Sequence, residues 1–258
     1  MRLMKRILSA AAVLALSASL LVGCSSGTAS SVPVSASSAA ESTVSSVEET
    51  ASSAVDENEA AAAQLLNDLT GSYQELWPVI LADEYKQTWL DDCTALVGEE
   101  NAEAAFEKLS SMVTGDVYGE DAVKAYANGG GAYFCGFTNS LATLTFDGET
   151  STISGTDKDG NVLFSHTYHY IGMEPVHGLY EFESDDADSG EFTYFFLAPD
   201  TSAETYHIEF RYGSDADALS QYDAGDYAYW VASGISTDCD QTMIDNCIEL
   251  FCTENLAG

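Results

Sequence analysis

A change of hydrophobic period to two, from about residue 132 onward, constrains the fold of this chain more than any other feature. The longest alternating run has ring-bearing or apolar side chains at every second position: Val162, Phe164, His166, Tyr168 and Tyr170. Shorter strand-like runs stand at 133–135, 141–146, 152–153, 178–183, 192–197 and 205–212. Asp147-Gly148 and Asp159-Gly160 are typical of hairpin turns. Consecutive strands with tight turns predict an antiparallel meander that closes, or nearly closes, into a β-barrel.

Residues with helical spacing flank the predicted strands. Between residues 57 and 96 apolar side chains recur every three or four positions, at Leu65, Leu66, Leu69, Tyr73, Leu76, Trp77, Ile80 and Leu81. Gly71 and Pro78 interrupt this stripe, so we expect two helices there. Further helices are predicted over residues 102–112, 215–222 and 240–254. The predicted fold class is therefore mainly β with flanking helices.

The first 24 residues have a basic start, an apolar run and the ending Leu21-Val22-Gly23-Cys24. The apolar run is too short to require a membrane span. The tetrapeptide resembles the lipobox of bacterial lipoproteins, in which residues 1–23 are removed as a signal peptide and Cys24 is acylated, for example with palmitate. This resemblance implies an extracytoplasmic protein that touches the bacterial cell membrane only through the lipid anchor on Cys24.

Composition divides the remainder into a tether and a domain. Residues 24–56 are almost entirely Ser, Ala, Thr, Val and Glu, and they contain no aromatic residue. Such a segment buries too little apolar area to offset the entropy lost on ordering, so we expect a disordered tether. All 14 Tyr, 11 Phe and 3 Trp fall within residues 57–258, which we expect to form one domain.

Charge and cysteine content limit the partners. The chain has 42 acidic and eight basic residues, and removal of Arg2, Lys5 and Arg6 with the signal peptide leaves a net charge of −37. We therefore expect neither nucleic acid nor an anionic membrane surface as a partner, whereas cations are favoured. Five cysteines follow Cys24, so at most two disulfides form in an exported chain, and their pairing stays open. No Cys-x-x-Cys motif is present, so no thiolate zinc site is expected.

Three segments resemble the ZinT (YodA) family of metal-binding proteins. Residues 69–81 (LTGSYQELWPVIL) resemble its opening tryptophan helix, and residues 227–251 resemble its tyrosine-rich closing segment. Residues 196–199 (FLAP) and 206–213 (YHIEFRYG) resemble its two ligand-bearing strands. The resemblance implies a calycin- or lipocalin-like antiparallel barrel with N-terminal helices and a C-terminal helix, which is exported and binds zinc or cadmium without catalysis. Relatives include domains of zinc-uptake lipoproteins, which implies a metal ABC importer as a partner.

The resemblance also assigns ligand positions. The family binds metal through one histidine before an Ile-Ala-Pro-like turn and through a His-x-His pair on the next strand. His207 matches the first histidine of the pair, and Glu209 stands at the position of the second. The remaining ligand position falls on Phe195, whose side chain cannot bind a metal.

The chemistry of the residues also favours a metal site at His207 and Glu209. His207 and Glu209 are two apart on a predicted strand, so their side chains share a face about 7 Å apart. Imidazole and carboxylate both bind zinc, and a third donor would make an open site. We expect that donor among His166, His169 and His177, and we expect binding to fade below about pH 6 because imidazole must be neutral.

A different interpretation of the same strand remains. Arg211 continues the face of His207 and Glu209, and such a row is also typical of a solvated strand face with the apolar residues buried opposite. No Gly-x-Ser-x-Gly motif or other nucleophile motif is present, so no catalysis is expected. The sequence thus predicts a lipoprotein that binds zinc or another divalent transition metal for capture, buffering or delivery. The alternative is a metal-independent calycin-like module for a small apolar ligand or a cationic partner.

Overall fold

The computed structural model describes residues 57–257. The predicted signal peptide, the lipidated Cys24 and the tether of residues 24–56 lie outside the described residues. Residues 61–258 form one compact unit by their internal contacts. This unit contains every strand of the barrel described below, and we expect it to fold on its own. None of the helices in the described part has both the length and the apolarity needed to cross a membrane.

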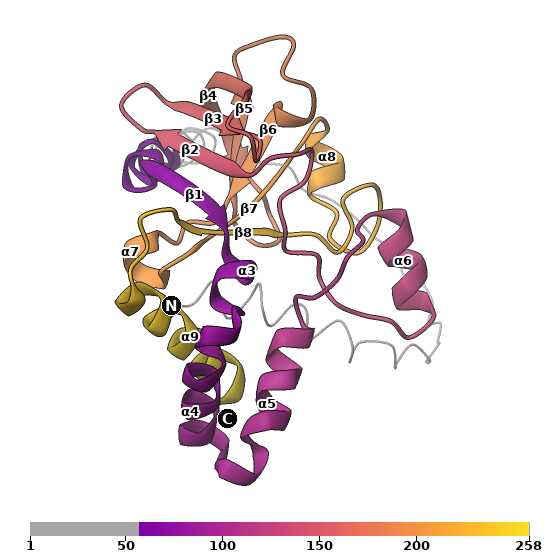
Figure 1. Cartoon of the computed structure of the whole chain (residues 1–258). Coiled ribbons are helices and arrows are strands. Elements are labelled where there is room, and N and C mark those ends of the chain that lie inside the picture. The colour runs from indigo at the N-terminus through magenta and orange to yellow at the C-terminus, as the bar shows by residue number, and fades with distance from the viewer. Residues whose placement is uncertain (1–56, 258) are drawn as a thin grey trace, which may run out of the picture. The chain divides into compact units, whose positions relative to one another are not determined.

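Eight strands within the described residues form one closed barrel (Figure 1). Each strand pairs antiparallel with the next along the chain, and β8 closes the barrel by pairing with β1. The strands are β1 (Gly71–Glu75), β2 (Thr143–Asp147), β3 (Thr152–Thr156), β4 (Val162–Met173), β5 (Tyr180–Ser184), β6 (Tyr194–Leu197), β7 (Ile208–Gly213) and β8 (Ala232–Ser236). The prediction of a closed antiparallel barrel is confirmed. Hairpin turns follow β2 and β3, where the Asp-Gly pairs predict them.

Aromatic side chains fill the barrel. Phe195 on β6 pairs in register with Tyr212 on β7, and their ring centroids lie 5.4 Å apart. Phe210, two residues earlier on β7, lies 6.4 Å from Phe195, and all three side chains are at most 1% exposed. The alternation along the strands thus places large rings inside, where they pack against one another as a core.

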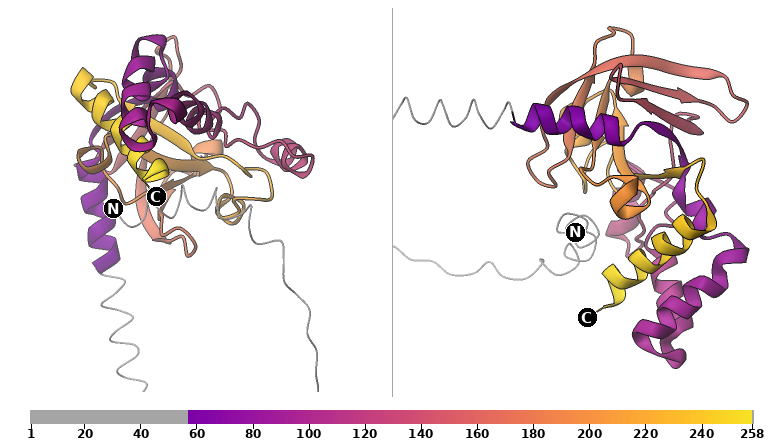
Figure 2. Two further views of the ribbon diagram at one scale, coloured as in Figure 1. Left: turned by 90° about the horizontal axis from the view of Figure 1, so that it is seen from below. Right: turned by 90° about the vertical axis from the view of Figure 1, so that its left-hand side faces the viewer.

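Helices gather mainly at one end of the barrel, where Figures 1 and 2 show α4, α5 and α9 together. A helix over residues 57–68 precedes β1. The others are α3 (Leu76–Ile80), α4 (Lys86–Val97), α5 (Glu99–Ser111), α6 (Glu120–Ala127), α7 (Ser202–Thr205), α8 (Ala216–Leu219) and α9 (Gln241–Leu256), with 3-10 turns at Asp83–Tyr85 and Gly190–Phe192. Asp240 caps α9 by accepting a hydrogen bond from the Met243 N–H at 2.8 Å.

Several predicted elements need correction. Gly71–Glu75 is strand β1 and not helix, because β2 and β8 both hydrogen-bond to it and the barrel closes only through it. Tertiary pairing therefore outweighs the helical spacing of its side chains. Residues 133–135 form only isolated bridges through Phe134. The prediction missed α6, α7 and β8, of which β8 (ASGIS) has little strand-forming character.

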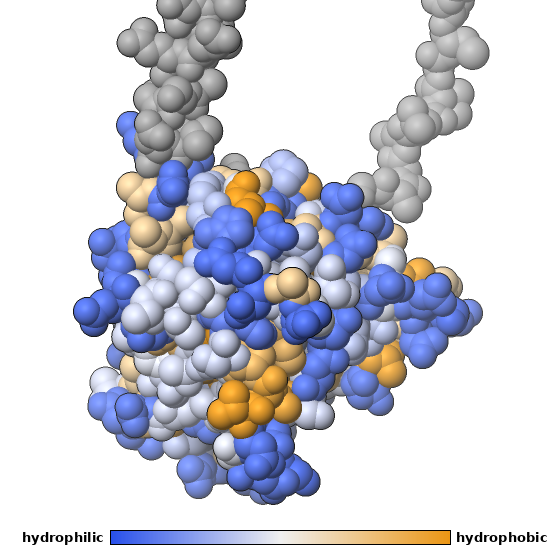
Figure 3. Space-filling model, turned by 90° about the horizontal axis from the view of Figure 1, so that it is seen from above, coloured by the Kyte–Doolittle hydropathy of each residue, from blue (hydrophilic) through white to orange (hydrophobic). Residues whose placement is uncertain are grey.

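The surface carries hydrophobic side chains in scattered places. The face in Figure 3 is largely hydrophilic, with hydrophobic residues in separate small areas. Val162 and Val176 are the most exposed of the large hydrophobic side chains described, at 70% and 69%. Single exposed apolar residues of this kind are normal for a folded protein and mark no interface.

Candidate metal site

His207 lies just before β7 and is packed against α9. Its side chain is 1% exposed, and its ring centroid lies 4.9 Å from that of Phe251. Nδ1 donates a hydrogen bond to the Thr205 carbonyl at 2.6 Å, and the Cys247 Sγ lies 3.9 Å from the same nitrogen. Because a carbonyl oxygen only accepts, Nδ1 carries the proton in the neutral ring. Nε2 is then the lone-pair nitrogen, which is how protein histidines are oriented toward metals.

Glu209 shares the face of His207, as the strand spacing predicts. Its Oε1 lies 3.9 Å from His207 Nε2, and its side chain is 10% exposed. The other oxygen, Oε2, is buried and has no hydrogen-bond partner. A buried carboxylate oxygen without a partner costs about 1–3 kcal/mol or more, and a bound cation removes that cost.

Two further carboxylates belong to the same neighbourhood. Asp200 lies between β6 and α7, Glu254 lies near the end of α9, and each has a buried carboxylate oxygen without a hydrogen-bond partner. Burial raises the pKa of both carboxyls, repulsion by Glu209 raises it further, and His207 opposes the shift. We call His207, Glu209, Asp200 and Glu254 the His207 cluster.

The charge of the His207 cluster is unbalanced. Among the described residues, no ion pair joins a lysine or arginine to any of its three carboxylates. One imidazolium against three carboxylates leaves two negative charges uncompensated. A divalent cation would neutralise them, and one nitrogen with several oxygens is a donor set that zinc accepts. The donor types of the His207 cluster are therefore compatible with a divalent metal.

The imidazole of His207 holds its proton strongly. Burial alone would lower its pKa, but interactions with Cys247 and Glu209 outweigh burial and hold the pKa well above 6.5. A metal at Nε2 therefore competes with a proton near neutral pH. This raised pKa moves the pH at which binding is expected to fade upward from about 6.

The His207 cluster is not a closed coordination sphere. Within residues 57–257 no three His, Cys, Asp or Glu side chains come together as a formed metal site. The four side chains are electrostatic neighbours, so metal binding requires side-chain rotations that bring their donor atoms to about 2.0–2.2 Å from one ion.

The other predicted histidines occupy separate environments. Both His166 and His169 lie on β4, where His166 Nδ1 is 2.8 Å from an Asp186 oxygen and His169 Nδ1 is 2.7 Å from an Asp185 oxygen. His177 lies in the β4–β5 turn, with its ring centroid 3.8 Å from that of Tyr222 and Nδ1 3.4 Å from Glu174. Among the described residues these three histidines do not gather with His207 as a formed metal site, and a third ligand among them stays a prediction.

The position of Phe195 in the fold explains why this residue does not serve as a metal ligand here. The side chain points into the barrel, where it packs against Tyr168 with ring centroids 5.4 Å apart. His207 and Glu209 lie on the opposite face of the neighbouring strand, beneath α9. A ligand at position 195 would therefore face the barrel core in this fold.

Sequence reasoning missed the two additional carboxylates for different reasons. Glu254 continues the buried α9 stripe of Ile244, Cys247 and Phe251 at three- and four-residue spacing. An acidic residue within the apolar stripe of a helix is visible in the sequence, and it indicates a carboxylate on the buried face. Asp200 follows a proline in a loop, where no periodic pattern distinguishes it from an ordinary turn residue.

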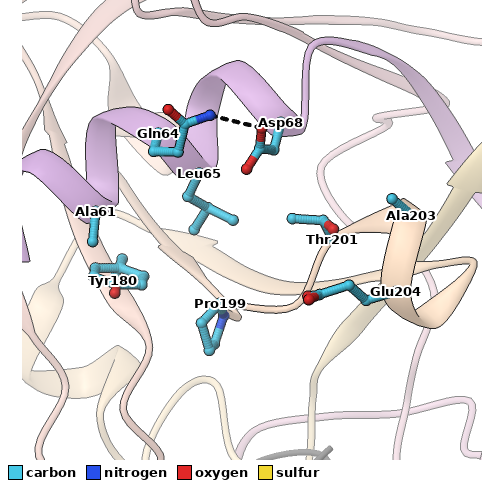
Figure 4. A pocket seen from close by; sticks show the side chains of 9 residues that line it. All are labelled: Ala61, Gln64, Leu65, Asp68, Tyr180, Pro199, Thr201, Ala203 and Glu204. Atoms are coloured by element: carbon cyan, nitrogen blue, oxygen red, sulfur yellow. Dashed lines mark hydrogen bonds between the residues drawn. The ribbon is translucent and has the colours of Figure 1, made fainter.

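A cavity of about 520 Å³ lies beside the loop that carries Asp200 (Figure 4). Its walls include Asp68 and Leu65 from the helix over residues 57–68, together with Thr201 and Glu204 from the loop and α7. Figure 4 shows Asp68 hydrogen-bonded to Gln64 on that helix. Two carboxylates at its walls make the cavity favourable to cations.

Comparison with known proteins gives matches to solved structures only. No family model matches the chain, and no curated protein matches it. The zinc-bound ZinT-like domain of Streptococcus pneumoniae AdcA is 15% identical over 71% of this chain and 89% of that domain, with a TM-score of 0.45. Zinc-bound AdcA from the same organism is 14% identical over 70% of this chain and 34% of its own length, with a TM-score of 0.42. Only the first of these matches is described as ZinT-like, and both similarities are too low to transfer a site to this chain.

Proposed function

We propose that this chain binds a divalent transition metal at the His207 cluster, with His207 Nε2 and Glu209 as the first ligands. Zinc is the metal we favour, because imidazole and carboxylate suit it, and cadmium is the second candidate. Asp200 and Glu254 supply charge compensation and further oxygen donors. The role we propose is capture or buffering of the metal outside the cytoplasm, on a lipid anchor at Cys24, with delivery to an importer.

One observation supports this proposal above the others. Three carboxylates lie within electrostatic range of one buried imidazole, and each carboxylate has a buried oxygen without a hydrogen-bond partner. Native proteins rarely leave such groups unsatisfied, and a bound ion is one of the standard explanations. The packed aromatic interior, with Phe195 and Tyr212 in contact, offers no support for the alternative of an apolar ligand inside the barrel.

Calorimetric titration of zinc into metal-free residues 57–258 tests the proposal. We expect one zinc ion per chain, and a loss of affinity in His207→Ala that exceeds the roughly 10–100-fold typical of losing a group that only supports a ligand, because the nitrogen ligand itself is lost. His169→Ala is the matched control: it removes an exposed histidine that already pairs with an acid, and its affinity should equal that of the parent. Absence of binding in the parent, or equal binding in parent and His207→Ala, would refute a site at His207.

Zinc affinity should depend on pH through His207. Interactions with Cys247 and Glu209 raise the pKa of His207 above its ordinary value, so a proton on this imidazole competes with zinc for the ring nitrogen. We therefore expect affinity to rise steadily from pH 6 to pH 8, with roughly one proton released per zinc, as measured by calorimetry in buffers of different ionisation enthalpy. A flat affinity between these pH values would show that the proton of His207 does not compete with the metal.

A further inference from the structure

The thiols of Cys93 and Cys252 face each other inside the protein. Their sulfur atoms lie 3.8 Å apart, and both side chains are fully buried. Cys93 lies on α4 and Cys252 on α9, two helices that pack side by side at the end of the barrel (Figures 1 and 2). The two residues are 159 positions apart in the chain, so their contact depends on the complete fold.

The remaining described cysteines have other surroundings. Cys247 places its sulfur 3.9 Å from His207 Nδ1, and Cys135 places its sulfur 3.9 Å from the Tyr133 carbonyl. Cys239 lies before α9 and is partly exposed. Cys93 and Cys252 are therefore the pair that the fold positions for a bond.

We infer that Cys93 and Cys252 form a disulfide that joins α4 to α9 in the mature protein. Formation of the bond requires the two sulfurs to approach from 3.8 Å to the bonding distance of about 2.05 Å. The reaction is thiol–disulfide exchange with a disulfide oxidant. The two thiols lose two protons and two electrons, the new S–S bond forms, and the oxidant's S–S bond is reduced to two thiols.

Burial determines when this bond forms. Exclusion from water raises the pKa of both the Cys93 and the Cys252 thiols, so in the folded, reduced protein they are protonated and shielded. Thiolates are the reactive species, so oxidation of the folded protein should be slow. The bond accordingly forms while the chain folds in an oxidising compartment, as in other exported proteins.

The bond would hold the part of α9 that contributes to the His207 cluster. Cys252 is next to Phe251, which packs on the His207 ring, and two residues before Glu254. The disulfide is independent of the proposed metal binding, because it rests on the α4–α9 contact and on the proposed location outside the cytoplasm. Failure of zinc binding would leave it unaffected.

Refolding in a redox buffer tests this inference. Residues 57–258 are unfolded in guanidinium with reductant and refolded in mixed oxidised and reduced glutathione. We expect free thiols per chain to fall from five to three, and a peptide map without reductant to link Cys93 to Cys252. Reduction should then lower the melting temperature by on the order of 10 °C, because the bond closes a very long loop.

Cys239→Ser is the matched control, and it should form the same bond with the same thermal shift. Cys93→Ser should show no bond and no difference between oxidised and reduced samples. If Cys93→Ser does not fold, the comparison of oxidised with reduced parent protein decides. Five free thiols after refolding, a bond that uses another cysteine, or equal melting temperatures in both states would overturn the inference.

Discussion

Replacement of Arg211 by Met is expected to lower the free energy of unfolding by about 3–5 kcal/mol. Arg211 is fully buried beneath the segment that follows β7. Its guanidinium donates hydrogen bonds to the carbonyls of Leu219, Gln221 and Tyr227, and it lies 4.2 Å from the ring centroid of Tyr222. Methionine fills similar volume but leaves these carbonyls without their donor.

Guanidinium-induced unfolding measures this effect, with Arg211→Lys as the comparison. Lysine keeps the charge, but its compact ammonium cannot donate to all three carbonyls as the planar guanidinium does. We therefore expect a loss of unfolding free energy smaller than that of Arg211→Met. A loss below about 1 kcal/mol for Arg211→Met would show that the buried guanidinium contributes little to holding this segment on β7.

Phe195→His is expected to destabilise the protein by about 3–5 kcal/mol without improving zinc affinity. The substitution supplies the histidine that the family pattern has at this position. In this structure, however, residue 195 faces the barrel interior, where its ring packs against Phe164, Tyr168, Phe210 and Tyr212. An imidazole there would lose this packing and bury ring nitrogens among aromatic rings.

Chemical unfolding and zinc calorimetry on the same samples measure both effects. Phe195→Leu serves as the control, because it removes the ring without introducing nitrogen and should cost less stability. A gain in zinc affinity of tenfold or more in Phe195→His would contradict the orientation described here, since it would mean that position 195 reaches the metal.

Much of the barrel was predictable from the sequence because period-two alternation and Asp-Gly turns are local signals. The alternation along β7 places Ile208, Phe210 and Tyr212 in the core, as expected. Local signals failed where tertiary pairing decided the structure. β1 carries a helical pattern yet closes the barrel, and β8 has weak strand propensity yet is held between β1 and β7.

The outer face of β7 shows why the site was harder to predict. His207, Glu209 and Arg211 form the polar row expected of a solvated strand, but α9 and the segment after β7 cover it. The spacing of residues along a strand does not indicate which face of that strand a helix from a distant part of the sequence will cover. The same limit applies to the placement of Glu254 and Asp200 within electrostatic range of His207, which depends on the docking of α9 and of a loop.

Diffraction from zinc-loaded crystals of residues 57–258, with data collected on both sides of the zinc absorption edge, tests the central claim most directly. We predict an anomalous peak about 2.0–2.1 Å from His207 Nε2, with an oxygen of Glu209 also bound. A structure with no zinc at His207, or with zinc only at the exposed pairs of His166 with Asp186 and His169 with Asp185, would contradict it.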